Sequence, residues 1–397
     1  GVYGDFDVDG LTATALLVEV LTADPLKGRV VTYLPHRQKE GYGLNPEAIR
    51  TLAARGVRLL ITVDCGVGAD EEIRLATQLG MDVVVTDHHR ISGGIPPALA
   101  VLNPRQQECE YPFKELAGVG LAYKLAEGLL SSAWNPRRAR ERLETVLDLV
   151  ALGTIADLAP LVGENRLLAK LGLQQINAGY RPGLRALLAA ANQNGRAVTA
   201  DSVSYVLGPR LNAAGRMGDA SVALDLLTTL SEVEANRLAA ELETANRDRQ
   251  AATAVALETA REELSRLDEL PPAIVLAGDY SSGIAGLVAN KLAEEFWRPS
   301  FIIELDELEC RGSGRGVPGF DVVTALAESS DLLLRYGGHS QAGGFSVRTG
   351  DLEAFRGRLV AAAQQQLVDA PDRELWLEAR LQLSAIGPAL YQSLEVL

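Results

Sequence analysis

Short apolar runs alternate with helical patterns over the first hundred residues. Apolar runs rich in β-branched residues are separated by stretches with helical periodicity. The runs lie at 30–34, 59–63 and 82–86, and the helical stretches at 11–21, 46–54 and 69–79. Strands that alternate with helices of this length are typical of βαβ units, in which helices cover both faces of a parallel sheet. The pattern predicts an α/β fold for this region.

A mainly helical region, broken by prolines, follows from about 114 to 226. Residues 231–267 then run for 37 positions without proline or glycine and are rich in Ala, Leu, Glu and Arg. At about 1.5 Å per residue such a helix spans roughly 55 Å. It is longer than one small core requires, so we predict that it connects two domains.

Beyond Pro271 and Pro272 the alternation of strands and helices resumes. We therefore predict an α/β domain, a long connector helix, a smaller α/β domain and a C-terminal strand, over 1–230, 231–268, 269–370 and 371–397. The strand is expected from Glu374 onward, where ELWLEARLQL alternates apolar and polar residues. The opening GVYGDF has the pattern of a strand interior, which predicts that the natural chain continues upstream.

Length and composition fit a globular protein with more than one domain. A chain of 397 residues and 42.4 kDa exceeds one usual core, and 47% hydrophobic with 23% charged residues is ordinary. No apolar run approaches the roughly 20 residues that cross a bilayer, so we expect no integral membrane protein. Three widely separated cysteines, Cys65, Cys109 and Cys310, argue against a disulfide framework and predict a cytoplasmic location.

The net charge of −14 ordinarily argues against a polyanionic partner. A sum does not reveal a local basic groove, however, and carboxylates gathered at a metal site lower the total. Only six of the 38 basic residues are lysine, and arginine is the better forked ligand for phosphate. Composition therefore leaves a nucleic-acid partner open.

Acidic residues and histidines collect where the predicted strands end. They are Asp5, Asp7 and Asp9 in GDFDVDG, Asp64 in DCG, Asp87, His88 and His89 in TDHH, and, after a later helix, Asp157 in GTIADLAPL. Because ligands of parallel sheets bind at the carboxyl ends of the strands, we expect these side chains to converge. Crowded carboxylates repel one another unless a cation neutralises them.

Carboxylates with a minority of imidazole suit Mn²⁺ or Mg²⁺, and one bridging carboxylate is typical of a two-metal hydrolase. On its own, D-x-D-x-D at a strand end is often a turn or a helix N-cap. All four histidines of the chain lie in loop motifs beside Gly, Asp or Arg, and none is on an apolar helix face. This placement favours the metal site.

In their order and spacing, GDFDVDG, VDCG, TDHH and GTIADLAPL resemble the four motifs of the DHH phosphoesterase superfamily. Its members include exonucleases of single-stranded DNA, oligoribonucleases, cyclic-dinucleotide phosphodiesterases, pyrophosphatases and exopolyphosphatases. Further segments resemble the exonuclease branch: Arg37 with EGYGL, Asn103-Pro104-Arg105, GPRLNAAGRM at 208–217, GSGR at 312–315 and GGHSQAGG at 337–344. The resemblance implies a parallel-sheet DHH domain joined by a long helix to a smaller α/β DHH-associated domain, with the active site in the interdomain cleft.

The resemblance also implies residue roles. The implied metal ligands are Asp7, Asp9, Asp64, His88 and Asp157, with Asp5 as a further candidate. Asp64 is the expected bridge between two ions, and His89 is expected to donate to a phosphate oxygen or, alternatively, to orient His88. Many superfamily members have a histidine at the position of Tyr3, so the ligand that replaces it stays open.

Substrate contacts follow from the same resemblance. Ser313 and Arg315 would bind the 5′-terminal phosphate, and the loop with Gly338 and His339 would add donors. The residues expected to contact the DNA strand along its path are Arg105, Arg210, Asn212 and Arg216.

The resemblance predicts hydrolysis of single-stranded DNA from its 5′ end to 5′-mononucleotides, in DNA repair and recombination. Its implied partners are single-stranded DNA and, by family, a single-stranded-DNA-binding protein or a helicase. One alternative is a phosphodiesterase of short oligonucleotides or cyclic dinucleotides. Another is a nucleic-acid-binding scaffold with a degenerate metal site. Against this alternative, every acidic and imidazole position of the four motifs is intact except that of Tyr3.

Overall fold

A computed structural model describes residues 1–91, 93–368, 375 and 377–395. The chain divides into two compact units, Gly1–Val255 and Ala256–Leu397. The division falls within the longest helix of the described residues, α12 (Glu232–Ser265). This helix lies within the range expected for the connector, and its residues up to Val255 belong to the first unit.

In the first unit, the described strands form a five-stranded sheet in the order β2-β1-β3-β4-β5. All its pairs are parallel. The strands are β1 (Val2–Tyr3), β2 (Thr32–Tyr33), β3 (Leu59–Val63), β4 (Asp82–Thr86) and β5 (Ala100–Leu102). The carboxyl ends of β1, β3 and β4 therefore lie at one edge, as the βαβ pattern predicts.

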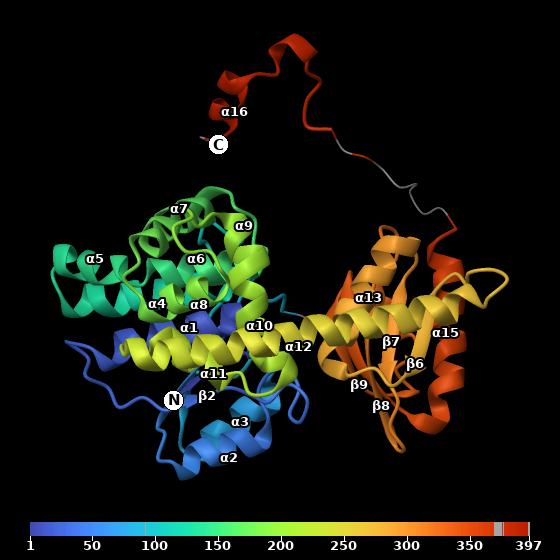
Figure 1. Ribbon diagram of the computed structural model, residues 1–397. Coiled ribbons are helices and arrows are strands. Elements are labelled where there is room, and N and C mark those ends of the chain that lie inside the picture. The colour runs from blue at the N-terminus through green and yellow to red at the C-terminus, as the bar shows by residue number, and fades with distance from the viewer. Residues whose placement is uncertain (92, 369–374, 376, 396–397) are drawn as a thin grey trace. The chain divides into compact units, whose positions relative to one another are not determined.

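Helices cover both faces of this sheet (Figure 1). Val2 and its face pack against α1 (Val8–Thr22) and α4 (Gly118–Ala133), whereas Tyr3 and the opposite face pack against α2 (Pro46–Ala54) and α3 (Asp70–Gln78). The remaining helices of the unit are α5 (Pro136–Glu144), α6 (Leu147–Ala156), α7 (Gly163–Ala178), α8 (Pro182–Ala190), α9 (Ala200–Ser202), the π-helix η1 (Val203–Leu207), α10 (Gly208–Met217) and α11 (Ser221–Thr228). Buried side chains of α6, α7, α8, α10, α11 and the start of α12 extend the core beyond the sheet.

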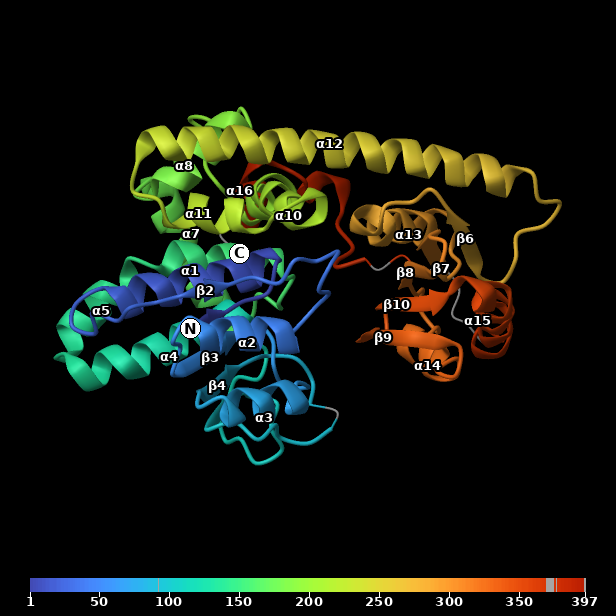
Figure 2. The same cartoon turned by 90° about the horizontal axis from the view of Figure 1, so that it is seen from below.

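The second unit contains a mixed sheet. Its described strands follow the order β6-β7-β8-β10-β9, parallel only between the first two. They are β6 (Ile274–Gly278), β7 (Ser300–Glu304), β8 (Glu309–Arg315), β9 (Leu333–His339) and β10 (Ala342–Arg348). Figure 2 shows α13 (Ser282–Phe296) and α14 (Val322–Ala327) on opposite sides of this sheet, and α15 (Leu352–Gln366) completes the core.

Two predictions about elements need correction, and one strand was not expected. The strand expected from Glu374 is absent from the described residues 375 and 377–395, in which the helices η3 (Leu383–Ala385) and α16 (Pro388–Glu395) form only at and after the end of the alternating stretch. Residues 371–374 and 376 lie outside the description. Strand β2 pairs over two residues only, and β5 was not predicted because its three residues carry no alternation.

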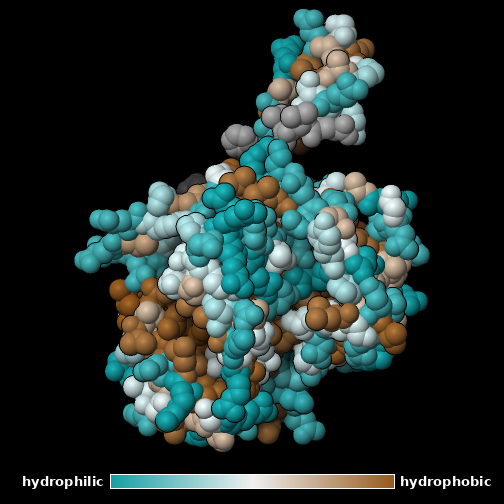
Figure 3. Space-filling view, turned by 90° about the vertical axis from the view of Figure 1, so that its left-hand side faces the viewer, coloured by the Kyte–Doolittle hydropathy of each residue, from teal (hydrophilic) through white to brown (hydrophobic). Residues whose placement is uncertain are grey.

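The described surface is consistent with the composition. Polar residues predominate on the face in Figure 3, with apolar residues in separate patches between them. No helix in the described part of the chain is both long and apolar enough to cross a membrane.

Candidate metal centre and phosphate-binding face

The loop between β1 and α1 places three aspartates together. Asp7 is the N-cap of α1, where its Oδ1 accepts hydrogen bonds from the backbone N–H groups of Asp9 (3.0 Å) and Gly10 (3.1 Å). A Cβ at Gly10 would come within 2.6 Å of the Asp5 nitrogen, so only glycine permits this close approach. The N-cap reading of the motif is thus correct for Asp7, and it leaves the Oδ2 atom outside the cap.

Asp9 is buried against the start of another helix. Its Oδ2 accepts from the N–H of Gly118 at 2.6 Å and its Oδ1 from the N–H of Val119 at 2.8 Å. These groups belong to the first turn of α4, where unpaired N–H groups and the helix dipole favour a negative charge. The carboxylate is 1% exposed and fixed in orientation.

Asp64 directly follows β3 in a strained conformation. Its φ is +62°, which non-glycine residues rarely adopt and which is common at functional sites. The Thr86 carbonyl accepts from the Asp64 N–H at 2.9 Å, and the hydroxyl of Tyr42 donates to the Asp64 carbonyl at 3.0 Å. Two hydrogen bonds, one to the end of β4 and one from the loop that carries Tyr42, therefore stabilise the strained backbone of Asp64.

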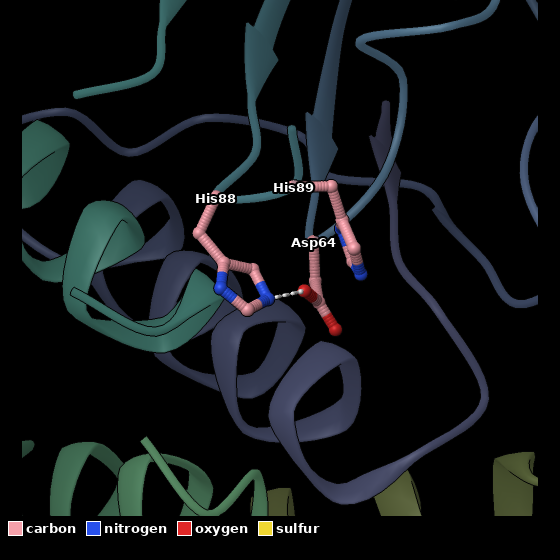
Figure 4. A group of neighbouring side chains, drawn as sticks. All are labelled: Asp64, His88 and His89. Carbon is pink, nitrogen blue, oxygen red and sulfur yellow. Dashed lines mark ion pairs between the residues drawn. The ribbon is translucent and has the colours of Figure 1, made fainter. Parts of the chain in front are cut away.

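His88 projects from the end of β4 into the same cluster. Its Nε2 lies 3.1 Å from Asp64 Oδ1, 3.9 Å from Asp9 Oδ2 and 3.8 Å from Asp157 Oδ2. The rings of His88 and His89 lie on either side of the Asp64 carboxylate (Figure 4). Four motifs far apart in the sequence thus meet at the carboxyl edge of the sheet.

The carboxylates of this cluster are poorly compensated. Burial, and then repulsion from Asp7, raises the pKa of Asp9 to about 7. Burial, and then the charge of Asp9, raises the pKa of Asp157 to about 9. The pKa values of Asp5 and Asp64 are also raised well above the usual range, mainly by burial and further by neighbouring aspartates. A cation is the natural compensation for such a cluster.

The donor atoms fit divalent cations. Oxygen atoms of Asp5, Asp7 and Asp64 lie within 4.8 Å of one another, and ligand atoms of Asp9, His88 and Asp157 form a second such group. Asp64 also groups with His88 and His89. Within the described residues, Asp5 Oδ1 is buried and makes no hydrogen bond. Carboxylate oxygens with one imidazole suit Mn²⁺ or Mg²⁺.

Tyr3 has a different role from that of a metal ligand. Its hydroxyl donates to the Gly43 carbonyl at 2.8 Å and accepts from Asn45 Nδ2 at 3.3 Å, and its ring stacks on Tyr33. The phenol therefore holds the loop that carries Tyr42. In the same loop, Glu40 accepts from the Tyr33 hydroxyl and from the His36 N–H.

His89 points its ring toward Asp64 but has its own partners. Asp87 Oδ1 lies 2.7 Å from His89 Nδ1, and the Tyr42 hydroxyl oxygen lies 3.2 Å from the same nitrogen. Asn103 Nδ2 donates to the His89 carbonyl at 2.9 Å. Asn103, the first residue of the motif Asn103-Pro104-Arg105, thus fixes the backbone of His89.

Arg37 is a half-buried cation that interacts with the acidic loop. Its guanidinium lies 4.8 Å from the centroid of the Phe6 ring, a cation–π contact. Burial lowers the pKa of Arg37, and the charges of Asp5 and Asp7 oppose that shift.

The residues of the first unit that are predicted to contact the DNA strand interact with other groups of the protein. Arg105 pairs with Glu115 at 2.8 Å, and Arg210 pairs with Glu243 of α12 at 2.6 Å. Asn212 Oδ1 accepts from the Val8 N–H at 3.2 Å, so α10 supports the acidic loop. Arg216 is half-buried in the last turn of α10.

The predicted phosphate contacts of the second unit share one face of its sheet. Arg315 of β8 and His339 of β9 are both paired with Ala342 of β10. Directly paired residues point to the same face, so Arg315 and His339 flank a floor of small residues, and Ser313 lies two positions from Arg315 on that face. Arg315 Nη1 donates to Ser313 Oγ at 2.9 Å.

The backbone conformation at position 338 requires a glycine. Its φ is +143°, and a Cβ there would come within 2.2 Å of the Ala342 carbonyl oxygen. The residues predicted to bind metal thus lie together within the first unit, and those predicted to bind the 5′-terminal phosphate lie within the second.

Comparisons with known proteins decide the family. A model of the DHH family, N-terminal domain, matches residues 1–154. The single-stranded-DNA-specific exonuclease RecJ of Dickeya dadantii is 38% identical over 401 residues, which covers 96% of this chain and 69% of the relative. The chain belongs to the RecJ family.

Two further RecJ proteins support this assignment. RecJ of Bacillus subtilis is 40% identical over 372 residues, covering 93% of this chain and 46% of the relative. The crystal structure of Thermus thermophilus RecJ in complex with Mn²⁺ matches 100% of this chain and 56% of its own, with a TM-score of 0.85 and 35% identity. The chain thus spans between about half and two thirds of these relatives' length. The superfamily resemblance and the predicted α/β fold are confirmed.

Several contacts of this RecJ-family site were missed by the sequence reasoning. Asp87 is the second residue of the TDHH motif and Tyr42 lies in EGYGL, but the sequence alone assigns neither of them a role. It also does not single out Gly118 and Val119, whose N–H groups bind Asp9. The sequence Gly-Val-Gly at the start of a helix could have indicated backbone N–H groups that are free to bind an anion.

Proposed function

We propose that this chain is the catalytic core of a metal-dependent exonuclease that hydrolyses single-stranded DNA from its 5′ end to 5′-mononucleotides. The observation that carries the proposal is the position of Asp64. Its carboxylate shares ligand-atom groups both with Asp5 and Asp7 and with His88 and His89. A carboxylate shared in this way is the expected bridge of a two-metal site. The RecJ relatives of Bacillus subtilis and Dickeya dadantii are single-stranded-DNA-specific exonucleases, which supports the substrate class.

We assign metal binding to Asp5, Asp7, Asp9, Asp64, His88 and Asp157. Two Mn²⁺ or Mg²⁺ ions bound there would activate a water for in-line attack on phosphorus and offset charge on the phosphoryl oxygens. The chain's own contribution is geometric: α4 holds Asp9, and the cap of α1 holds Asp7. His89 would donate to a non-bridging oxygen as charge develops.

We assign substrate binding to residues of both units. Ser313, Arg315, Gly338 and His339 would bind the 5′-terminal phosphate, because a guanidinium, an imidazole and close backbone approach suit an anion. The path of the DNA strand would depend on four residues of the first unit, which would contact the DNA directly or position the acidic loop: Arg105, Arg210, Asn212 and Arg216. The free thiols Cys65, Cys109 and Cys310 support a cytoplasmic location. A single-stranded-DNA-binding protein or helicase is a further proposed partner.

Three matched substrates test this function: a 5′-phosphorylated single strand, the same sequence as a blunt duplex, and a dinucleotide. We expect mononucleotide release from the single strand in Mn²⁺, little from the duplex, and none when the metal is chelated. Faster turnover of the dinucleotide than of the single strand would instead identify a short-oligonucleotide phosphodiesterase. Strand binding without any hydrolysis in Mn²⁺ or Mg²⁺ would identify a binding scaffold.

The matched variant is Asp64→Ala. It should lose hydrolysis and retain the fold, because it removes the carboxylate expected to contact both ions. Retention of more than a small fraction of activity at saturating Mn²⁺ would show that the bridging assignment is wrong.

A further inference from the structure

Asp87 is a buried carboxylate beside the metal set, and it has no assigned role. It is 1% exposed and directly follows β4. Its Oδ2 accepts from the Val67 N–H at 3.0 Å, and its Oδ1 accepts from the His89 N–H at 3.0 Å. Both oxygens are therefore used as acceptors by backbone groups of two different loops, which fixes the plane of the carboxylate.

The same Oδ1 atom lies 2.7 Å from His89 Nδ1, closer than the Tyr42 hydroxyl oxygen at 3.2 Å. An ionised carboxylate can only accept, so this contact requires the proton on Nδ1. The distance is that of a charge-assisted hydrogen bond.

Tyr42 gives an independent reason for the same proton position. Its hydroxyl has one proton, which it donates to the Asp64 carbonyl, an atom that can only accept. The Tyr42 oxygen can then only accept from His89 Nδ1, 3.2 Å away. Two neighbouring groups thus require a protonated Nδ1, and Asn103 fixes the backbone of the same residue through the His89 carbonyl.

We propose that Asp87 is a positioning residue that holds His89 with its proton on Nδ1, so that Nε2 is the ring atom directed to a scissile phosphate. An imidazole oriented by a carboxylate in this way keeps one tautomer throughout turnover. The inference rests on the proposed function for its catalytic consequence, but the proton position on His89 is independent of any substrate.

The variant Asp87→Asn tests the inference. Whichever way the amide is turned, its NH₂ group faces a donor, either the Val67 N–H or the two donors of His89. We expect kcat on a 5′-phosphorylated single strand to fall by about 10²-fold or more, with KM and Mn²⁺ affinity changed much less. Asp82→Asn is the matched control, because Asp82 is exposed at the start of the same strand.

Histidine labelled with ¹⁵N supplies a readout that does not depend on activity. The chain has four histidines, and His89→Gln identifies the His89 signals by their loss. The wild-type protein should show a far-downfield proton bonded to His89 Nδ1, and Asp87→Asn should shift it upfield or remove it. A wild-type His89 with an unprotonated Nδ1 would overturn the inference, even if the protein proves inactive on DNA.

The double variant Asp87→Asn, His89→Gln separates this role from a general loss of structure. If Asp87 acts through His89, its kcat should lie within about threefold of that of His89→Gln alone, because the losses are not additive. Multiplied losses would overturn the proposal, as would a fall in Mn²⁺ affinity as large as the fall in kcat. Absence of hydrolysis by the wild-type protein would refute the proposed function. The ¹⁵N spectra would then still decide whether the proton of His89 is on Nδ1.

Discussion

The Asp9 carboxylate is bound by the backbone of Gly118, whose N–H donates to Oδ2 at 2.6 Å. The first turn of α4 therefore presents its positive end to a metal-ligand candidate 109 residues away in the sequence. A Cβ at Gly118 would also lie 2.7 Å from Asp64 Cβ. One glycine thus sets the distance between two carboxylates of the site.

We expect Gly118→Ala to weaken Mn²⁺ binding by at least about tenfold, because the added methyl group must displace Asp64. Calorimetric titration with Mn²⁺ measures the effect. Gly128→Ala is the matched control in the same helix, since nothing lies within 4 Å of its Cβ position. That control should keep its affinity and gain about 0.5–1 kcal/mol of stability. Equal affinities of the two variants would contradict this account of the helix start.

The metal-free protein should lose stability as pH rises. The folded-state pKa is about 7 for Asp9 and about 9 for Asp157, against a usual value of 3.8. Between 3.8 and these values the folded state holds protons that the unfolded state has released, so the free energy of unfolding falls with increasing pH. Melting temperatures in a chelator should therefore decrease from pH 5 to pH 9.

Saturating Mn²⁺ should remove most of this decrease, because the ions replace the protons as partners of the carboxylates. Asp157→Asn should flatten the metal-free curve mainly between pH 7 and pH 9, where Asp9 has already ionised. A melting temperature that rises over this range in the chelator would be incompatible with an uncompensated cluster.

A buried ion network joins three helices of the first unit. Arg181, 10% exposed, donates to both oxygens of Asp148 at 2.6 and 3.1 Å and also pairs with Glu19. Removing the guanidinium leaves the buried Asp148 carboxylate without this cation, whereas the half-buried Glu19 keeps Arg142 at 3.9 Å. We expect Arg181→Ala to lower the free energy of unfolding by about 3–5 kcal/mol, measured in urea.

Arg185→Ala is the control for this network. Arg185 pairs with Glu232, but both side chains are well exposed, so the loss should stay within about 1 kcal/mol. Similar losses in the two variants would mean that burial of the network contributes nothing.

The candidate ligands could be predicted from the sequence because parallel strands bring their carboxyl ends together. Asp5, Asp64 and His88 each follow a strand, so the βαβ pattern alone places them at one edge. The partners of these residues could not be predicted in the same way. The Asp9 contact with Gly118 and the Tyr3 contact with Gly43 join segments that share no periodicity. Such contacts depend on tertiary packing, which a single sequence does not encode locally.

The pairing of β8, β10 and β9 gives the final prediction. Arg315 and His339 lie on either side of Ala342, and only small residues separate them. If this face binds the 5′-terminal phosphate, Arg315→Ala removes a charge-assisted contact of about 1.5–3 kcal/mol. That loss corresponds to about one to two orders of magnitude in kcat/KM on a 5′-phosphorylated single strand.

Two comparisons separate recognition of the 5′ end from support of the fold. On a strand with a 5′-hydroxyl the loss caused by Arg315→Ala should be much smaller, because the phosphate that Arg315 would bind is missing. A minimal phosphodiester that contacts only the metal set should be hydrolysed at nearly the wild-type rate. Arg311→Ala, on the same strand with an exposed side chain, should leave all three rates within about twofold. Equal losses on all three substrates for Arg315→Ala would show that Arg315 supports the structure of the unit and does not read the 5′ end.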